Sequence, residues 1–231
     1  MDAARLFKSV AECSRRAPFG RKVKLDRSAA DYLPEKRSLK SLREAAAHCR
    51  GCDLYKAATQ TVFGEGKARA RMMFIGEQPG DSEDREGHPF VGPAGKLLRK
   101  AMVEAGIDPD ATYITNAVKH FKYIVRGKRR IHQTPRVIEL RACRPWLDAE
   151  IQQVKPDVIV ALGSTAAKSL FGSEFRLTMH RGHVFTSMEV APNVVATVHP
   201  SSILRAPDDK SRHLELSKFV ADLKRVAAIE R

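Results

Sequence analysis

Four short apolar runs constrain the fold more than any other feature of the sequence. Each run has the length of a buried strand, and each ends in or is followed by glycine, proline or polar residues. We therefore predict four strands at these runs, which are Met72-Met-Phe-Ile75, Tyr113-Ile-Thr-Asn116, Val158-Ile-Val-Ala-Leu162 and Val194-Val-Ala-Thr-Val198.

Helical patterns lie before, between and after these runs. The spacing Ser41-Leu-Arg-Glu44 is that of a capping box, which predicts a short helix ahead of Cys49. Strands that alternate with helices are typical of a layered α/β protein. We expect a three-layer αβα fold with a central, mostly parallel, four-stranded twisted sheet. The other predicted helices cover residues 94–105, 136–154, 164–170 and roughly 211–229.

The chain is long enough for one sizeable folded domain. It has 231 residues, of which 43% are hydrophobic, and no linker-like stretch divides its middle. Residues 1–40 are basic and only weakly periodic, which predicts an N-terminal extension that is at most partly ordered. The single domain is expected to run from residue 41 to residue 231.

An excess of positive charge points to a polyanionic partner. Lys and Arg number 41 against 27 acidic residues, a net charge of +14. Phosphates neutralised by Lys and Arg release condensed counterions, which favours binding. The alternative is a merely soluble basic protein, because charge alone does not name the partner.

The sequence also predicts the compartment. No apolar run approaches the roughly 20 residues that span a bilayer. Residues 1–24 carry charges throughout and lack the apolar centre of a secretory signal. We expect a cytoplasmic protein with no membrane partner, in a reducing compartment where thiols stay free or bind metal.

Two of the cysteines have the spacing of a metal or redox pair. Cys49-Arg-Gly-Cys52 is a CxxC motif, and the remaining cysteines are Cys13 and Cys143. A bound metal would need two more ligands, from Cys143, Cys13 or a histidine. Spacing alone does not separate a zinc site with three Cys and one His from an iron–sulfur cluster.

Polar, turn-rich segments follow each predicted strand. In open parallel sheets, ligands bind beyond the carboxyl ends of the strands, so these segments predict the active site. The Gly163-Ser164 helix start is either an anion site or a plain helix cap. The four segments are Gly76-Glu-Gln-Pro-Gly80, Asn116, Gly163-Ser164 and His199-Pro-Ser201.

Two further segments bear on ligands. Residues 122–136 form a long basic insertion at the same edge of the sheet, where loops often carry function, although a solvated charged loop is the simpler interpretation. Gly92-Pro-Ala-Gly95-Lys96 resembles a nucleotide phosphate loop. Its first glycine position is occupied by Phe90 and its Ser/Thr position by Leu97, so we expect no nucleotide cofactor.

The block from Gly76 to Gly95 carries the strongest resemblance to a known family. It reads GEQPGDSEDREGHPFVGPAG and resembles the first motif of the iron–sulfur branch of the uracil-DNA glycosylases. The likeness extends from about residue 41 to the C-terminus, with the motifs in the family's order. The further motifs are Thr115-Asn-Ala-Val-Lys119, Ala142-Cys-Arg-Pro145, Ala161-Leu-Gly-Ser164 and His199-Pro-Ser201.

The resemblance assigns roles at the base pocket. Phe90 would stack on a flipped uracil, and the amide of Asn116 would pair with its Watson–Crick edge. His199 would stabilise negative charge on the departing base. The resemblance also places Gln78 and Asp81 among the substrate-binding residues, and Gln78 is expected to hold the basic loop in place as well. Without it, core packing would be the preferred interpretation of Phe90.

One departure concerns the cluster ligands. The family usually has Cys where this chain has His120. The resemblance then implies a structural [4Fe-4S] cluster held by Cys49, Cys52, His120 and Cys143, with Zn²⁺ as the alternative. Histidine can ligate cluster iron, as in Rieske centres. Cys13 falls outside the resemblance.

A second departure resembles the UdgX-type group, whose members bond covalently to DNA after excising uracil. Its hallmarks here are Gln78 and the basic segment Lys128-Arg-Arg-Ile-His132. The resemblance implies that His132 attacks the anomeric carbon of the sugar. Glu77 would orient or deprotonate the His132 ring, or stabilise the developing cation on the sugar. The groups expected to contact DNA are Lys128, Arg129, Arg130, Gly163, Ser164 and Ser201.

Two other functions remain open. The first is a conventional hydrolytic uracil-DNA glycosylase in which His132 only contacts phosphate. The second is a non-enzymatic, metal-stabilised DNA-binding protein. The resemblance favours a monomeric enzyme acting on uracil in single- or double-stranded DNA, with single turnover if the histidine attaches to the sugar.

Overall fold

The structure is a computed structural model that describes residues 27–229. Most of the predicted basic extension, together with Cys13, lies outside the described residues. Within the described range, no helix combines the length and the hydropathy that a bilayer crossing needs.

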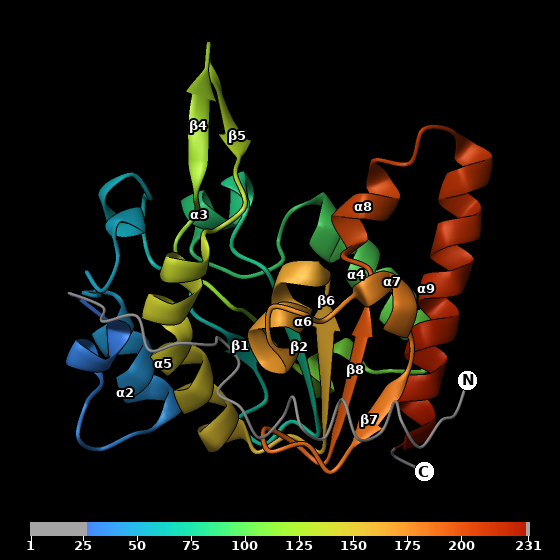
Figure 1. The fold of residues 1–231 in the computed structure, drawn as a ribbon, viewed down its shortest axis with the longest axis horizontal. Coiled ribbons are helices and arrows are strands. Elements are labelled where there is room, and N and C mark those ends of the chain that lie inside the picture. The colour runs from blue at the N-terminus through green and yellow to red at the C-terminus, as the bar shows by residue number, and fades with distance from the viewer. Residues whose placement is uncertain (1–26, 230–231) are drawn as a thin grey trace.

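A six-stranded mixed sheet forms the centre of the molecule (Figure 1). Its order is β1-β3-β2-β6-β8-β7, and the four inner strands are parallel while the two edge strands are antiparallel. The predicted αβα fold and all four predicted strands are confirmed. The strands are β1 Glu65–Gly66, β2 Met72–Gly76, β3 Tyr113–Asn116, β6 Val158–Leu162, β7 Val184–Thr186 and β8 Asn193–Thr197.

The predicted strand number was wrong because both edge strands lack the signal used to find strands. β1 has two residues and no apolar run, and β7 has three residues with one buried. Edge strands are paired on one side only, so neither needs the continuous apolar sequence of a strand buried on both faces.

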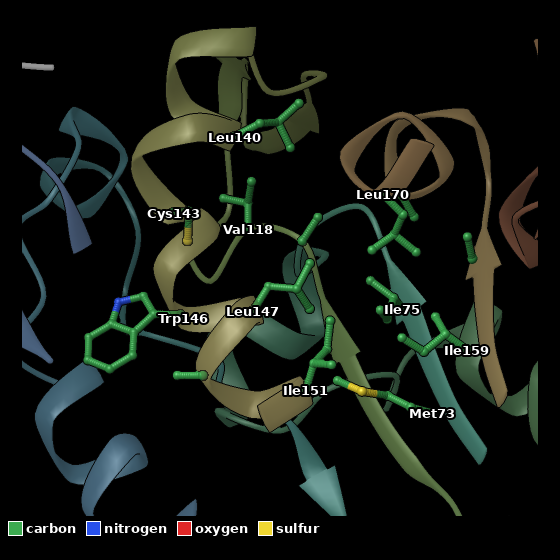
Figure 2. Close-up of a cluster of buried hydrophobic side chains, with 14 of the residues drawn as sticks. Met73, Ile75, Val118, Leu140, Cys143, Trp146, Leu147, Ile151, Ile159 and Leu170 are labelled. Atoms are coloured by element: carbon green, nitrogen blue, oxygen red, sulfur yellow. The ribbon is translucent and has the colours of Figure 1, made fainter. Parts of the chain in front are cut away.

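Alternate residues of the inner strands enter two separate cores. Met73, Ile75 and Ile159 belong to one core, whereas Phe74 and Val160 belong to the other. Because successive side chains of a strand point to opposite faces, a sheet covered on both sides has continuous apolar strands. Figure 2 shows part of the first core, where β2 and β6 meet α5 (Val137–Val154).

The helices form the two outer layers. α2, α5 and α6 line the first core, while α4, α8 and α9 line the second. The helices predicted from periodicity are confirmed, with ends that differ by one or two residues. Besides α5, the helices are α2 Leu39–Ala46, α3 Asp81–Glu86, α4 Pro93–Glu104, α6 Ser164–Phe171, α7 Leu177–His180, α8 Pro200–Leu204 and α9 Asp209–Ile229, with short 3-10 turns η1 Ala29–Tyr32, η2 Asp53–Lys56 and η3 Pro109–Ala111.

The start of α2 differs from the prediction. Ser38 is the N-cap: its Oγ accepts the backbone N–H of Ser41 at 3.1 Å, and Ser41 Oγ accepts the N–H of Ser38 at 3.0 Å. The predicted box at Ser41 and Glu44 was wrong because a serine supplies the returning acceptor that glutamate usually supplies. Just before α2, η1 contacts α5 and buries Ala29.

The basic segment after β3 is a β-hairpin rather than the expected loop. β4 (Tyr123–Arg126) pairs antiparallel with β5 (Arg129–His132). A two-residue turn joins them, and Gly127 there has φ of 56°, which suits the first central residue of a hairpin turn. Figure 1 shows the hairpin projecting from the carboxyl edge of the sheet, above α3.

Candidate functional site

Two of the predicted base-contacting residues meet where β2 and β3 end, and we call this place the floor of the candidate pocket. Gly76 and Asn116 are the last pair of the β2–β3 ladder. A Cβ atom at Gly76 would lie 2.3 Å from Asn116 Oδ1 and 2.7 Å from Phe90 Cζ. Residue 76 must therefore be glycine for the amide and the ring to approach each other. The structure thus brings together the two predicted base-contacting residues.

The backbone of Phe90 is held in an unusual conformation. Its φ is 56°, in the left-handed region that costs a non-glycine residue roughly 1–2 kcal/mol. The first turn of α4 packs directly on it, since a Cβ at Gly95 would lie 1.7 Å from Phe90 O. Glu83 braces this loop by accepting the N–H groups of Gly80 at 3.0 Å and Gly92 at 2.9 Å.

His199 faces Phe90 from the end of β8. Their ring centroids lie 5.9 Å apart. The backbone N–H of Ser201 donates to His199 Nδ1 at 3.2 Å, so in the neutral ring the proton resides on Nε2. Burial, with the nearby charges of Arg205 and His132, lowers the pKa of His199 to about 4. The ring is therefore a neutral hydrogen-bond donor at physiological pH.

Glu77 and His132 form a second pair at the mouth of the site. His132 Nε2 lies 3.3 Å from Glu77 Oε1. The other carboxylate oxygen accepts a hydrogen bond from Thr165 Oγ1, near the start of α6. Among the described residues, no group forms a hydrogen bond with the buried Glu77 Oε1, and the His132 ring lies beside this oxygen.

The environment of His132 favours the neutral ring. Burial lowers its pKa, Glu77 opposes this effect, and Arg205 adds to it. The side chain is still 48% exposed, so the ring is accessible from solvent. A neutral imidazole has a lone pair and is the nucleophilic form.

Gln78 holds the base of the hairpin. Its Nε2 donates to the carbonyls of Lys122 and Gln133, both at 3.1 Å, and its Oε1 accepts the N–H of Lys122 at 3.2 Å. One side chain therefore spans both ends of the hairpin. These contacts match the expected role of Gln78 in holding the basic loop, and its expected contact with substrate stays a prediction.

Arg130 and Asp81 bind each other. Arg130 forms ion pairs with Asp81 and, at 2.6 Å, with Asp84, and its guanidinium lies over the ring of Tyr123 at 4.9 Å. Asp81 also pairs with Arg85 at 3.0 Å. These contacts fasten the hairpin to α3. The expected roles of Arg130 at phosphate and Asp81 at substrate stay predictions.

The remaining predicted DNA contacts fall into two groups. Lys128 and Arg129 are exposed at the tip of the hairpin, and Ser164 is exposed at the start of α6. Gly163, with φ of 90°, packs beside His199, where an added Cβ would lie 3.0 Å from the histidine Cβ. Ser201 contacts His199 through both its N–H and its Oγ.

Three cysteines gather between α5 and the segment after α2. Cys49 and Cys143 are buried, and Cys52 is half-buried. Burial raises the pKa of the Cys52 and Cys143 thiols, and Cys143 also lies within electrostatic reach of Cys49 and Cys52. Trp146 Nε1 donates to Cys49 Sγ at 3.2 Å, and the Lys119 N–H donates to Cys143 Sγ at 3.3 Å.

The cysteine sulfurs have N–H donors of the kind found around iron–sulfur clusters. Within residues 27–229, no group of three or more His, Cys, Asp or Glu side chains converges closely enough for one metal ion. A four-iron cluster needs thiolates spaced around a larger body, and N–H donors to the sulfurs are typical of such sites. Trp146 and Lys119 supply such donors to Cys49 and Cys143.

His120 is connected to the cysteine region through Thr61. Thr61 Oγ1 donates to the carbonyl of Ala46 at 2.8 Å and lies 3.2 Å from His120 Nε2. Because the hydroxyl proton is used at Ala46, the imidazole must donate through Nε2, which leaves Nδ1 with the lone pair. Burial lowers the pKa of His120 to about 4, so the ring is neutral.

Sequence reasoning missed two residues at the site. Thr165 is an ordinary helix residue in the sequence, and only the fold brings it to Glu77. Arg205 follows α8 and acts electrostatically on both His132 and His199. Arg205 follows His199 by six residues, and this closeness to a motif histidine could have identified it, since cations near a DNA-facing loop favour phosphate.

Comparisons with known proteins agree with this architecture. A family model described as "Uracil DNA glycosylase superfamily" matches residues 63–224. A type-4 uracil-DNA glycosylase of Sulfurisphaera tokodaii is 38% identical over 178 residues, which cover 74% of this chain and 78% of that protein. The type-4 enzyme of Thermotoga maritima is 37% identical over 75% of this chain and 86% of its own length. That of Archaeoglobus fulgidus is 33% identical over 80% and 93%. This chain therefore belongs to the uracil DNA glycosylase superfamily.

Proposed function

We propose that this protein excises uracil from DNA. The observation that carries the proposal is the floor of the pocket, where Asn116 Oδ1 and the edge of Phe90 meet over Gly76, with the neutral ring of His199 beside them. The names of the type-4 relatives point to the same activity.

The side-chain chemistry suits an extruded uracil. The Asn116 amide offers a donor for O4 and an acceptor for N3–H, whereas cytosine presents the reverse pattern. Phe90 supplies a flat apolar face that replaces the stacking lost on base flipping. Because both side chains are buried, a mismatched hydrogen bond at this position would leave an unsatisfied polar group.

His199 would assist departure of the base. Cleavage of the bond between C1′ and N1 leaves its electron pair on uracil, so negative charge develops on O2. A neutral Nε2–H placed beside that oxygen stabilises this charge without needing to be ionised first.

Hydrolysis is the outcome that best fits the relatives' names. Water then captures the sugar, and Glu77 is placed to orient that water or to stabilise the developing positive charge. Under this proposal His132 contacts only the DNA backbone.

One observation favours covalent capture as a second candidate. The half-exposed His132 ring lies 3.3 Å from Glu77, and burial lowers its pKa. An imidazole nitrogen would supply the electron pair for a new bond to C1′ as the pair of the broken bond leaves with uracil. The imidazolium formed would lie beside the Glu77 carboxylate. Proximity of this kind reaches effective molarities of about 10⁵ M or more.

We further propose that Cys49, Cys52 and Cys143 hold an iron–sulfur cluster, with Nδ1 of His120 as the fourth ligand. When bound, such a cluster would crosslink α5 to the segment after α2, a structural role. The same free thiols favour a reducing compartment such as the cytoplasm. We propose that the protein acts as a monomer.

One experiment tests the activity and both outcomes at the sugar. The protein is incubated with single-stranded DNA that contains one uracil, and free uracil and detergent-resistant protein–DNA species are both measured. Uracil release supports the glycosylase proposal, and no release refutes it. A boiling-resistant species that is lost in His132→Ala supports covalent capture, whereas free abasic DNA alone supports hydrolysis.

A further inference from the structure

Lys119 carries a charge in the interior of the protein. It lies between β3 and the hairpin, and its side chain is 0% exposed. A buried ammonium needs a full set of partners. Its Nζ donates to Thr115 Oγ1 at 2.6 Å, to the carbonyl of Asn116 at 2.7 Å and to the carboxylate of Glu150. All three ammonium protons are therefore used.

Glu150 completes this network from α5. It is also fully buried, and its Oε1 accepts the Gly64 N–H at 2.9 Å and the Tyr113 hydroxyl at 3.0 Å. The Thr115 hydroxyl, which accepts from Lys119, donates to the same carboxylate. The ion pair is thus satisfied on both sides and lies directly beneath the end of β3.

Lys119 reaches α5 at two positions. Its backbone N–H donates to Cys143 Sγ at 3.3 Å, and its ammonium pairs with Glu150 two turns further along the helix. Figure 2 shows Cys143, Leu147 and Ile151 on the side of α5 that faces the sheet. Lys119 therefore attaches the segment after Asn116 to α5 at two points, which are Cys143 in the cysteine region and Glu150 two turns later.

This attachment bears directly on Asn116. Gly76 and Asn116 form the last pair of the β2–β3 ladder, and beyond it the N–H groups of Ala117 and Val118 still donate to the carbonyls of Gly76 and Glu77 at 2.9 and 3.0 Å. The ammonium of Lys119 holds the Asn116 carbonyl at this point. The carbonyl and the side-chain amide belong to the same residue. A shift of the Asn116 main chain would therefore change the position at which the amide meets a base.

We infer that Lys119 is a positioning residue that aligns the Asn116 amide with uracil and joins the pocket to the cysteine region of α5. This inference rests on the proposed uracil excision. Its chemistry is local: Lys119 touches no substrate, and it acts through the carbonyl of Asn116.

The test uses the double variant Lys119→Met with Glu150→Gln, which removes both buried charges together. We expect the rate of uracil release under single turnover to fall about 10- to 100-fold, as misplaced reacting groups typically cause. Inhibition by free uracil should weaken as well. The affinity for uracil-free single-stranded DNA should stay unchanged, because no phosphate contact is altered.

Tyr113→Phe is the matched control. It removes one hydrogen bond to the same carboxylate but leaves the Lys119–Asn116 contact intact. We expect it to lower the melting temperature while the rate of uracil release stays at the wild-type value. If the double variant does not fold, Thr115→Val replaces it, since this change removes one ammonium partner and keeps the ion pair; we expect a smaller loss of rate.

A wild-type rate of uracil release in the folded double variant, or in Thr115→Val, would show that Lys119 only stabilises the fold, and the inference would be wrong. Absence of uracil release by the wild-type protein would instead refute the proposed function, so the two failures are distinguishable.

Discussion

The floor of the pocket and the hairpin beside it are held in opposite ways. Asn116 and Phe90 are 3% and 6% exposed and are fixed by strand ends, a close helix turn and buried partners. His132, on the hairpin, is 48% exposed, and its strand is fastened by the side chains of Gln78 and Arg130. Under the proposed function, base selection would depend on the core, whereas the contact of His132 with the DNA or the sugar would depend on the attached hairpin.

This contrast has a physical reason. Reading one base against another needs hydrogen-bond groups placed within a fraction of an ångström, which only a packed interior provides. Engaging a DNA strand needs an element that reaches outward, and such elements lie at the surface. Changes in the two regions should therefore affect different steps of the reaction.

The largest effect should come from Gly76→Ala. The new Cβ would overlap Asn116 Oδ1 and Phe90 Cζ, so both groups must move. We expect single-turnover uracil release to fall at least about 100-fold. The affinity for uracil-free DNA should not change, because the hairpin is untouched. Uracil release near the wild-type rate would mean that the floor does not select the base.

Arg130→Met should affect the hairpin and leave the floor of the pocket largely unchanged. It removes the hairpin's ion pairs to Asp81 and Asp84. We expect uracil release to fall no more than a few-fold, while any covalent product falls about 10-fold as His132 is held less firmly. Arg129→Met is the matched control, since Arg129 is exposed on the same strand. If both variants behave alike, the anchoring role of Arg130 is wrong.

A moderate effect is expected for Thr165→Val, which keeps the shape of the side chain but removes its hydrogen bond to Glu77. Glu77 should then turn more freely, and capture of the sugar, by water or by His132, should slow about 3- to 10-fold. Thr165→Ser keeps the hydroxyl and should restore the rate. Burst kinetics that separate excision from capture would measure the change, and a slower excision step would contradict it.

The pH dependence should be flat across the ordinary histidine range. The pKa of His199 is about 4, and burial also lowers that of His132 below its usual value near 6.5. The His199 ring stays neutral as the pH falls through 6.5, so uracil release should decline only as His199 gains its proton near pH 4. A rate profile measured from pH 4 to 8 with a midpoint near 6.5 would contradict this assignment.

The smallest effect should come from Lys128→Ala at the tip of the hairpin. Loss of one phosphate contact should reduce the slope of log affinity against log salt by about 0.7 for single-stranded DNA. Uracil release at saturating DNA should not change. An unaltered slope would mean that the tip does not contact the backbone.

Much of the fold was predictable because both faces of the inner sheet are buried. Continuous apolar runs such as 158–162 indicated strands, and a glycine or proline marked the end of each intervening helix. Short elements were not predictable in this way. β1 and β7 are edge strands with few buried residues, and the hairpin strands carry so many charges that they resemble a loop.

The candidate site was predictable only in part. The resemblance singled out Phe90, Asn116 and His199, and these converge in the structure. Arg130 was expected to bind phosphate because a surface arginine beside a basic run usually does, but its carboxylate partners come from α3, far away in sequence. Pairing across 46 or more residues leaves no local signal.

The sequence by itself determined the layered α/β fold and the edge of the sheet where the candidate site lies, because periodicity and strand-end residues are local properties. The residues proposed for the uracil pocket came from the resemblance of its motifs to a family. Only the tertiary structure decided which charges are already paired. It assigned Arg130 to the hairpin's attachment, Thr165 to Glu77 and Lys119 to the carbonyl of Asn116. The reason is that a charged side chain binds the partner that folding brings nearest, and that partner is set by packing between distant segments.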